Sequence, residues 1–225
     1  MEDLNLFPLF LSLKVALLAT IFGMMIGLPV AYYLSKTKSK LSDIIDTMIT
    51  LPIVLPPTVL GYYLLVILGR ESWIGRFLEE KFQIMLVFTP TGAVIAASVV
   101  SIPYLIKSAR AAFSEVGRDM IHAATLLGRS ELNIFFSIIV PLAWRGIASG
   151  IILSFARALG DFGTTLMVSG SIPDRTLTMP IAIYDAMQTG NTALTNQLVL
   201  IMTAVSIVVL FTLNRLEKRM GKKGF

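Results

Sequence analysis

Two residues of opposite charge, Arg157 and Asp161, stand four positions apart within an otherwise apolar stretch. Residues four apart share one face of a helix, so these side chains are within reach of each other. A lone charge at mid-membrane costs about 2.5–3.5 kcal/mol, so such a residue is expected to pair or to face a wet cavity. The pair either lines such a cavity, where Arg157 could act as a counter-charge to an anion, or fixes helix packing. We favour packing, because a strong fixed charge would hold an anion too tightly.

Other residues that commonly carry chemistry are scarce. The 225 residues include no Cys and a single His, His122. A disulfide framework, thiolate catalysis, iron–sulfur clusters and Cys-ligated zinc are therefore excluded, and a His-built metal site is not expected. The phosphate-binding pattern G-x-x-x-x-G-K-[ST] is absent, so the chain cannot cradle ATP phosphates in that way and any ATP has to act elsewhere. We expect no catalytic residue, metal or cofactor in this chain.

The composition is that of a membrane protein. Hydrophobic residues make up 55% of the chain and charged residues 15%, with a mean hydropathy of +0.78, whereas a soluble domain carries about 25% charged residues. A membrane-spanning helix needs about 20 apolar residues. Four uncharged stretches are long enough, and a fifth is interrupted by Arg145, Arg157 and Asp161; two short re-entrant pieces are the alternative for that fifth stretch. We expect one all-α domain, residues 1–225, with five spans at about 13–35, 46–69, 84–106, 142–168 and 196–214.

The net charge of +5 suggests either nucleic acid or the cytoplasmic side of a membrane as a partner. If the N-terminus is outside, 4 basic residues fall in outer segments and 13 in inner segments, which predicts this orientation and a C-terminus inside. Nucleic acid is not an expected partner, because the basic residues are divided among short loops rather than gathered on one face. The inner residues are Lys36, Lys38, Lys40, Lys107, Arg110, Arg118, Arg129, Arg145, Arg215, Lys218, Arg219, Lys222 and Lys223.

The second inner loop, at about residues 107–141, is much longer than a connection between two spans requires. Apolar residues recur in it at helical spacing, Gly128 is placed as a helix C-cap, and Ser130 is placed as the cap of a second helix that begins at Glu131. We expect a helix, a glycine turn and another helix. This segment is too polar to span a membrane and too apolar to remain merely solvated, so it requires a partner.

The spacing in this loop resembles the cytoplasmic signature of permease subunits of ATP-binding-cassette importers: E-A-A, three residues, Gly, nine residues, Ile, one residue and Leu-Pro. His122 replaces the usual acid, which puts in doubt any contact that needs a carboxylate, and Val140 replaces Leu. The resemblance implies a type I importer fold in which the loop docks on an ATPase and Pro141 begins the fourth span. The implied coupling residues are His122, Ala123, Ala124, Gly128, Arg129, Ser130 and Pro141.

Three further segments resemble the molybdate branch of these permeases, with the sulfate permeases as close relatives. They are L-P-I-V-L-P-P-T-V-L-G-Y-Y-L-L at 51–65, S-F-A-R-A-L-G-D-F-G at 154–163 and S-I-P-D-R-T-L-T-M-P-I-A-I-Y at 171–184. The resemblance implies a lipid-embedded homodimer in the inner or plasma membrane of a prokaryote, two ATPase subunits that bind the ATP, and an extracytoplasmic binding protein that delivers the oxyanion.

The expected cargo is molybdate or tungstate, and a sulfate or thiosulfate importer is the alternative. An ATP-independent secondary transporter is less favoured, because it would have more charges within its spans and an internal repeat, and neither is found.

Prolines and glycines within the expected spans mark candidates for the translocation path. Proline breaks helix hydrogen bonds and glycine permits close approach of helices. Irregular backbone at membrane depth is tolerated where it is packed in protein or lines a cavity. Tight helix packing alone explains these residues equally well. The path or gate candidates are Pro56, Pro57, Gly61, Gly160, Gly163 and Thr164.

Overall fold

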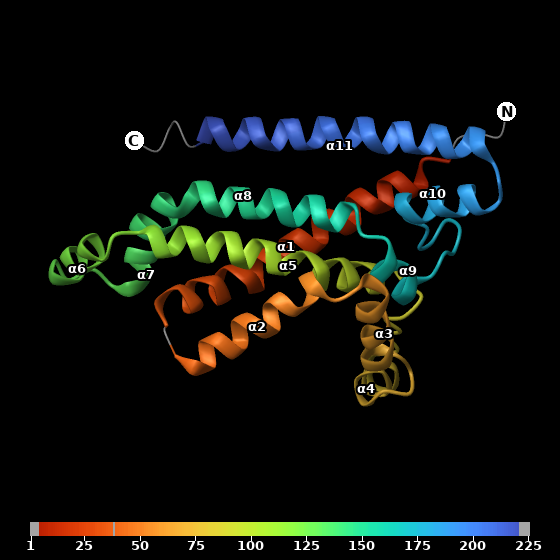
Figure 1. Ribbon diagram of the computed structural model, residues 1–225. Helices are drawn as coiled ribbons and strands as arrows, with labels where there is room; N and C mark the ends of the chain where they lie inside the picture. Colours follow the sequence, from red (N-terminus) through yellow and green to blue (C-terminus); the bar gives the residue numbers. More distant parts are fainter. Residues whose placement is uncertain (1–4, 38, 221–225) are drawn as a thin grey trace.

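The computed structural model describes residues 5–37 and 39–220, and every regular element within these ranges is a helix (Figure 1). Three of the predicted inner basic residues, Lys38, Lys222 and Lys223, lie outside the described residues. The helices are α1 (Phe7–Lys36), α2 (Lys40–Val54), α3 (Pro57–Leu68), α4 (Trp73–Phe82), α5 (Pro90–Glu115), α6 (Arg118–Leu126), α7 (Glu131–Ile134), the π-helix η1 (Phe135–Ile139), α8 (Val140–Leu159), α9 (Gly163–Ser169), α10 (Met179–Gln188) and α11 (Thr192–Met220). The described chain is all-α, as predicted.

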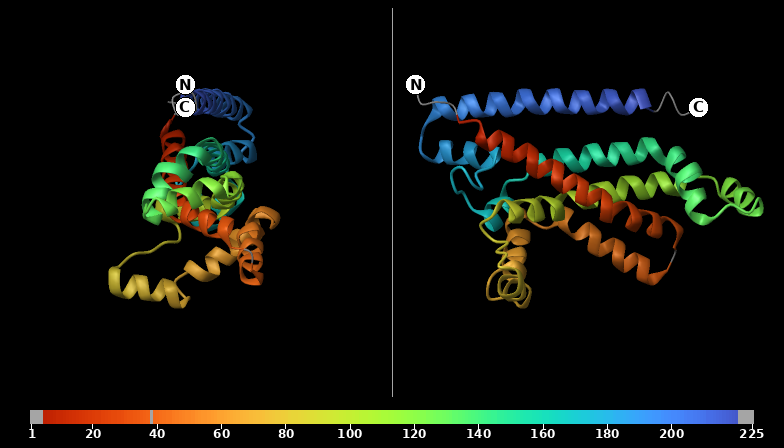
Figure 2. Two further views of the ribbon diagram at one scale, coloured as in Figure 1. Left: turned by 90° about the vertical axis from the view of Figure 1, so that its left-hand side faces the viewer. Right: turned by 180° about the vertical axis from the view of Figure 1, so that it is seen from behind.

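Three long helices, α1, α5 and α8, pack side by side and form the core of the bundle (Figures 1 and 2). Small residues set their spacing. A Cβ added to Gly23 or Gly27 of α1 would lie 3.2 Å from a side-chain atom of Ile102 or Ile106, respectively, on α5. Lipid chains are as apolar as these side chains, so helices in a membrane associate through such close contacts rather than through the hydrophobic effect.

α5 and α8 cross in close contact at Gly146. A Cβ at this position would lie 2.3 Å from the Ala112 Cβ atom, and the Ser108 hydroxyl donates a 2.8 Å hydrogen bond to the Gly146 carbonyl. One turn further along α8, a Cβ at Gly150 would lie 3.0 Å from the Ser108 Cβ atom. Residue 146 therefore has to be glycine unless α5 moves away.

Among the described residues, four helical segments are long and apolar enough to cross a membrane, and a bent helix pair adds a fifth if it crosses as one unit. The bent pair consists of α2 and α3, which meet at 115°. α11 lies along the outside of the bundle and is almost entirely exposed (Figure 1). The four segments are Phe7–Lys36, Pro90–Glu115, Glu131–Leu159 and Thr192–Lys218.

The helix in the expected second span, residues 46–69, is broken at Leu55 and Pro56. The Leu55 amide still bonds to the Leu51 carbonyl, but Pro56 and Pro57 have no N–H with which to continue the ladder. α3 then begins with Pro57 in its first turn, where the missing N–H costs nothing. The two consecutive prolines thus account for the sharp bend.

The helix in the third span is displaced from the expected residues 84–106. It begins at Pro90, because the Thr89 hydroxyl accepts a 3.1 Å hydrogen bond from the Gly92 amide and caps the helix. It continues to Glu115, beyond the first charged residues, Lys107 and Arg110. Lys and Arg are favourable helix residues, so the helix continues past the apolar stretch, and both cations pair with Asp46.

The fourth span, expected at residues 142–168, differs from the structure at both ends. Pro141 does not begin the helix, because α7, η1 and α8 form one helical run that starts at Glu131. The Val140 amide bonds to the Phe135 carbonyl in the π-helical turn that precedes Pro141. The run ends at Leu159, and α9 starts only at Gly163. The predicted single span is therefore a long helix followed by a break and a short helix.

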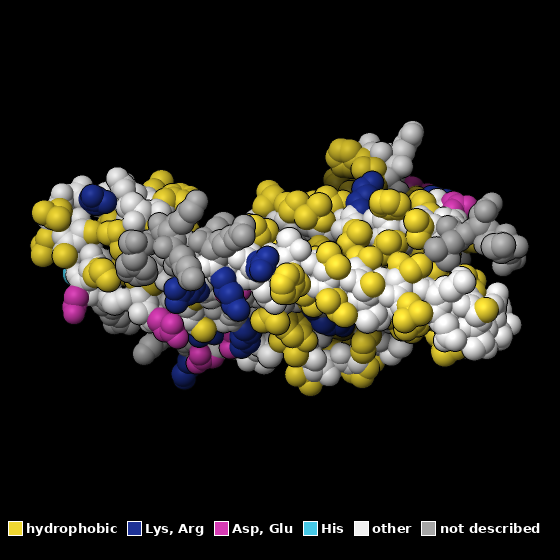
Figure 3. Space-filling view, turned by 90° about the horizontal axis from the view of Figure 1, so that it is seen from above, with side chains coloured by type: hydrophobic (Ala, Val, Ile, Leu, Met, Phe, Trp, Pro, Cys, Tyr) yellow, Lys and Arg dark blue, Asp and Glu magenta, His cyan; other side chains and the backbone are white. Residues whose placement is uncertain are grey.

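The segments that carry the predicted inner basic residues gather at one end of the bundle. The connection from α1 to α2, the loop helices α6 and α7, and the C-terminal end of α11 lie at this end, whereas α9 and α10 lie at the other (Figures 1 and 2). On the face that carries α11, charged side chains are concentrated towards the same end, and much of the remaining surface is hydrophobic or uncharged (Figure 3). This arrangement is the one that the predicted topology requires.

Replacing Gly146 should disrupt the bundle. In Gly146→Val, the added side chain has to displace Ala112 and α5. We expect the free energy of unfolding to fall by about 1–3 kcal/mol or more. The measurement is the thermal midpoint of the detergent-purified protein, followed by size-exclusion chromatography. Gly117→Ala is the matched control, since a Cβ at Gly117 meets nothing within 4 Å. A midpoint for Gly146→Val equal to that of the control would contradict the packing argument.

Candidate functional site

The predicted helix, glycine turn and second helix are present between α5 and α8. α6 is separated from α5 by an additional break at Val116 and Gly117. It ends in a Schellman motif: the Gly128 amide bonds to the Thr125 carbonyl at 3.0 Å, and the Arg129 amide bonds to the Ala124 carbonyl at 3.2 Å. Gly128 has φ +77°, a left-handed conformation that favours glycine.

The second helix of the loop is capped as the sequence predicts. The Ser130 hydroxyl accepts a hydrogen bond from the Asn133 amide at 3.4 Å. The Arg129 guanidinium donates to the Ser137 hydroxyl at 3.3 Å and so connects the turn to η1. These contacts fix the direction of α7 relative to α6.

The predicted coupling residues divide into exposed and buried positions. His122 and Ala123 are exposed, and His122 lies at a cavity of about 450 Å³ that is also lined by Lys36 and Phe113. Ala124 is 5% exposed and belongs to the core cluster that contains Phe113. Ala124 therefore packs α6 onto the bundle and does not present itself to another molecule.

Large apolar side chains near the turn are exposed, and the sequence analysis did not single them out as site residues. Leu126 and Leu127 are 89% and 81% exposed. The available signal was two leucines directly before a cap glycine, in a loop that is too polar to span a membrane. Such a patch on a loop is typical of a protein interaction site. We call it the loop surface: Met120, Leu126, Leu127, Leu132 and Phe136.

Within the predicted membrane region, Asp161 is 3% exposed, and its carboxylate bonds to Arg157 and Thr165, four residues away on either side. One carboxylate oxygen accepts from the Arg157 guanidinium at 3.3 Å. The other accepts from the Thr165 amide at 3.0 Å and from the Thr165 hydroxyl at 2.7 Å. Because α8 ends at Leu159, the pair spans a helix break rather than one helical face. Asp161 thus caps the start of α9 and joins it to α8, which supports the packing role.

Most of the path candidates meet where α3 crosses α9. The Thr164 hydroxyl donates a 3.3 Å hydrogen bond to the Pro57 carbonyl, and a Cβ at Gly163 would lie 3.0 Å from the Pro57 Cβ atom. A Cβ at Gly61 would lie 2.5 Å from the Met167 Cβ atom. These residues pack two short helices together, and Thr164 is fully buried.

The other two candidates lie outside this contact. Pro56 is exposed at the bend before α3. Gly160 caps the end of α8, where an added Cβ would meet only the Ala156 carbonyl oxygen, at 3.6 Å. Gly160 therefore ends a helix and does not mediate close packing.

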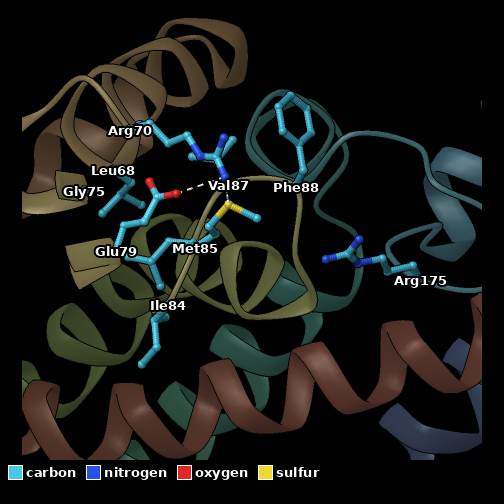
Figure 4. A pocket seen from close by; sticks show the side chains of 11 residues that line it. Leu68, Arg70, Gly75, Glu79, Ile84, Met85, Val87, Phe88 and Arg175 are labelled. Carbon is cyan, nitrogen blue, oxygen red and sulfur yellow. Dashed lines mark hydrogen bonds and ion pairs between the residues drawn. The ribbon is translucent and has the colours of Figure 1, made fainter. Parts of the chain in front are cut away.

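A cavity of about 410 Å³ lies between α3, α4 and residues 84–88 (Figure 4). Arg70 on its wall forms a 3.0 Å ion pair with Glu79 and contacts the Met85 sulfur. Arg175 reaches the cavity from the segment between α9 and α10. In the described part of the chain, no group of three or more His, Asp and Glu side chains is arranged to hold a metal ion.

A bundle of membrane-length helices, with an apolar loop surface at one end, defines an integral membrane protein that works with other subunits. The family model for the binding-protein-dependent transport system inner membrane component matches residues 19–222. The chain belongs to this family. It is a multi-pass permease subunit of the inner membrane.

The relatives include molybdenum permeases. The chain is 41% identical to the putative molybdenum transport system permease protein YvgM of Bacillus subtilis, over 91% of this chain and 90% of that protein. It is 36% identical to the molybdenum transport system permease protein ModB of Azotobacter vinelandii, over 90% of both chains.

Solved importers share the fold at low sequence identity. A chain of the inward-facing MetNI methionine ABC transporter has a TM-score of 0.77 at 16% identity, covering 98% of this chain and 99% of that one. A chain of a bacterial alginate ABC transporter, in complex with a periplasmic protein bound to an alginate pentasaccharide, has a TM-score of 0.80 at 14% identity, covering 99% of this chain and 81% of that one.

Removing the Asp161 carboxylate should destabilise the protein. Asp161→Ala removes the ion-pair partner of Arg157 and the acceptor of the Thr165 amide. We expect the free energy of unfolding to fall by about 3–5 kcal/mol. Asp161→Asn keeps an acceptor for Thr165 and should lose less. Thermal unfolding in detergent measures both, with Asp43→Asn as the control because Asp43 is exposed. Equal midpoints for Asp161→Ala and Asp43→Asn would contradict the capping role.

Proposed function

We propose that this chain is the membrane-spanning subunit of an ATP-driven importer that carries molybdate, or tungstate, delivered by an extracytoplasmic binding protein. The observation that carries the proposal is the identity of 36–41% to molybdenum permeases over about nine-tenths of the chain. In this proposal the chain has no cofactor and no catalytic residue of its own. ATP is bound and hydrolysed by a partner ATPase.

The loop surface is where the ATPase docks. Leu126 and Leu127 project beside a rigid glycine turn, and Ala124 and Ile134 anchor the two loop helices on the core. A movement of the docked loop helices can therefore be transmitted to the bundle. His122 stands exposed where the family signature has an acid, so docking relies on apolar contact at this position and not on a carboxylate.

A second copy of the chain completes the path. The core of one bundle is closely packed, so an ion requires a route along its surface, between two copies. The outer face of α2 and α3 supports this arrangement, because Met48, Val54 and Tyr62 are 62%, 75% and 58% exposed. Lipid covers the apolar faces that the homodimer leaves free. Two ATPase subunits then bind, one to each loop.

The loop end of the bundle faces the cytoplasm, the N-terminus is outside and the C-terminus is inside. This orientation is supported by the gathering of basic segments at the loop end. The opposite end, with the cavity lined by Arg70 and Arg175, then faces the binding protein. A sulfate or thiosulfate importer remains the second candidate, because the sulfate permeases are close relatives of the molybdate branch.

Charge placed in the loop surface should prevent ATPase docking. In Leu126→Asp, an unpaired carboxylate enters an apolar interface, and we expect at least about a tenfold loss of co-purified ATPase. Leu216→Asp is the matched control, since Leu216 is an exposed leucine at the same end of the bundle, on α11. Normal ATPase recovery with Leu126→Asp would refute docking at this surface.

The cargo is tested with the reconstituted complex of permease, ATPase and binding protein. Binding protein loaded with molybdate should stimulate ATP hydrolysis and drive uptake of molybdate into proteoliposomes, and sulfate should do neither. Stimulation by sulfate alone would identify a sulfate importer. Uptake of molybdate without the ATPase would identify a secondary transporter.

A further inference from the structure

α2 is held on the bundle by one narrow face. Ser42 is the one buried side chain of this helix, and Ile45 and Ile49 pack against a core cluster that includes residues of α1, α5 and α8. These residues and Asp46 follow helical spacing along the same face. The opposite face is exposed and apolar. Because apolar contacts between helices have no hydrophobic driving force in lipid, a polar contact has more influence on where α2 lies.

Asp46 makes that polar contact with two cations of α5. The Lys107 ammonium donates to both carboxylate oxygens, at 2.9 and 2.8 Å, and the Arg110 guanidinium lies 2.7 Å from one of them. The three side chains are between 26% and 39% exposed. Exposed ion pairs contribute little to stability, but this half-buried pair uses charge-assisted bonds from two successive turns of α5. It fixes α2 in both position and rotation.

The two ends of α2 have different attachments. The cations that hold Asp46 lie near the end of α5, which leads through Val116 and Gly117 into α6 and the loop surface. The far end of α2 reaches the bend at Leu55 and Pro56. Beyond the bend, α3 is fixed to α9 by the contact of Thr164 with Pro57. α2 therefore connects the end of α5 to the α3–α9 contact, with a proline bend between.

We propose that Asp46 is a positioning residue for transport: it makes α2 follow the end of α5 when the docked loop moves, and the bend at Leu55 and Pro56 converts that motion into a displacement of α2 relative to α3. This inference rests on the proposed function, because it assigns the route by which the ATPase acts on the membrane path. Asp46 contacts no substrate and acts through the placement of α2.

The test compares molybdate ions imported per ATP hydrolysed in the reconstituted complex. In Asp46→Asn, ATPase recovery and ATP hydrolysis should be retained, and the ratio of imported ions to ATP should fall at least about fivefold. Asp43→Asn, at an exposed acid on the same helix, should leave the ratio unchanged. Asp46→Lys should lower the ratio of imported ions to ATP as far as Asp46→Asn does. Combining Asp46→Lys with Lys107→Asp and Arg110→Asp should restore at least about half of the wild-type ratio.

A wild-type ratio in Asp46→Asn would overturn the proposal, as would a combined variant that assembles and stays as uncoupled as Asp46→Lys. A merely structural role would reduce recovery, ATP hydrolysis and import together, and it would leave the ratio of imported ions to ATP unchanged. If the wild-type complex imports no oxyanion with ATP, the proposed function fails, which is a separate result.

A second measurement does not depend on the stability of the Asp46 variants. Because the chain has no cysteine, spin labels can be placed by Met48→Cys with Glu115→Cys, and by Met48→Cys with Val66→Cys. A non-hydrolysable ATP analogue should leave the first distance, from α2 to α5, unchanged and should alter the second, from α2 to α3. A change in the first distance, or none in the second, would overturn the proposal.

Discussion

Every backbone amide and carbonyl in a membrane-spanning segment has to find its partner inside the protein, because lipid offers none. Two helix breaks interrupt the predicted spans, one between α2 and α3 and one between α8 and α9, and each has a polar contact beside it. The Asp161 carboxylate accepts from an amide at the start of α9, and the Thr164 hydroxyl donates to the carbonyl of Pro57. Each break thus supplies or receives a group at the contact between α3 and α9. The irregular parts of the fold thus stabilise one another, whereas the regular core of α1, α5 and α8 approaches closely at its glycines.

The closely packed contacts of the bundle differ from the apolar faces that remain exposed. Glycines at the α5–α8 crossing leave no free space, as the position of Gly146 against Ala112 illustrates. The loop surface and the outer face of α2, in contrast, present large apolar side chains that the described part of the chain leaves exposed. Subunit contacts are therefore expected at these exposed faces, and helix packing at the glycines.

The long helices could be predicted from the length of the apolar stretches. The glycine turn could be predicted from Gly128 and Ser130, because helix caps depend on residues that are neighbours in the sequence. The breaks were harder to predict, because an apolar stretch of sufficient length does not show whether its helix is continuous. Arg157 and Asp161 were predicted as a pair, but on one helical face, and the structure places Asp161 after the helix ends. The contact of Asp46 with Lys107 joins residues 61 apart, and no local pattern indicates it. Ala124 and Leu126 belong to one short helix, and only the packed structure separates the buried residue from the exposed one.

The π-helical turn at Phe135–Ile139 sets a phase difference between the loop and the bundle. A π turn accommodates one extra residue, and each residue of an α-helix advances the side chains by about 100°. The stripe of α8 that contacts α5 is therefore out of phase with the face of α7 that carries Leu132 of the loop surface, although the helical run is unbroken from Glu131 to Leu159. The direction in which the loop faces its partner can thus be tuned by the length of this turn, independently of the residues that pack the core.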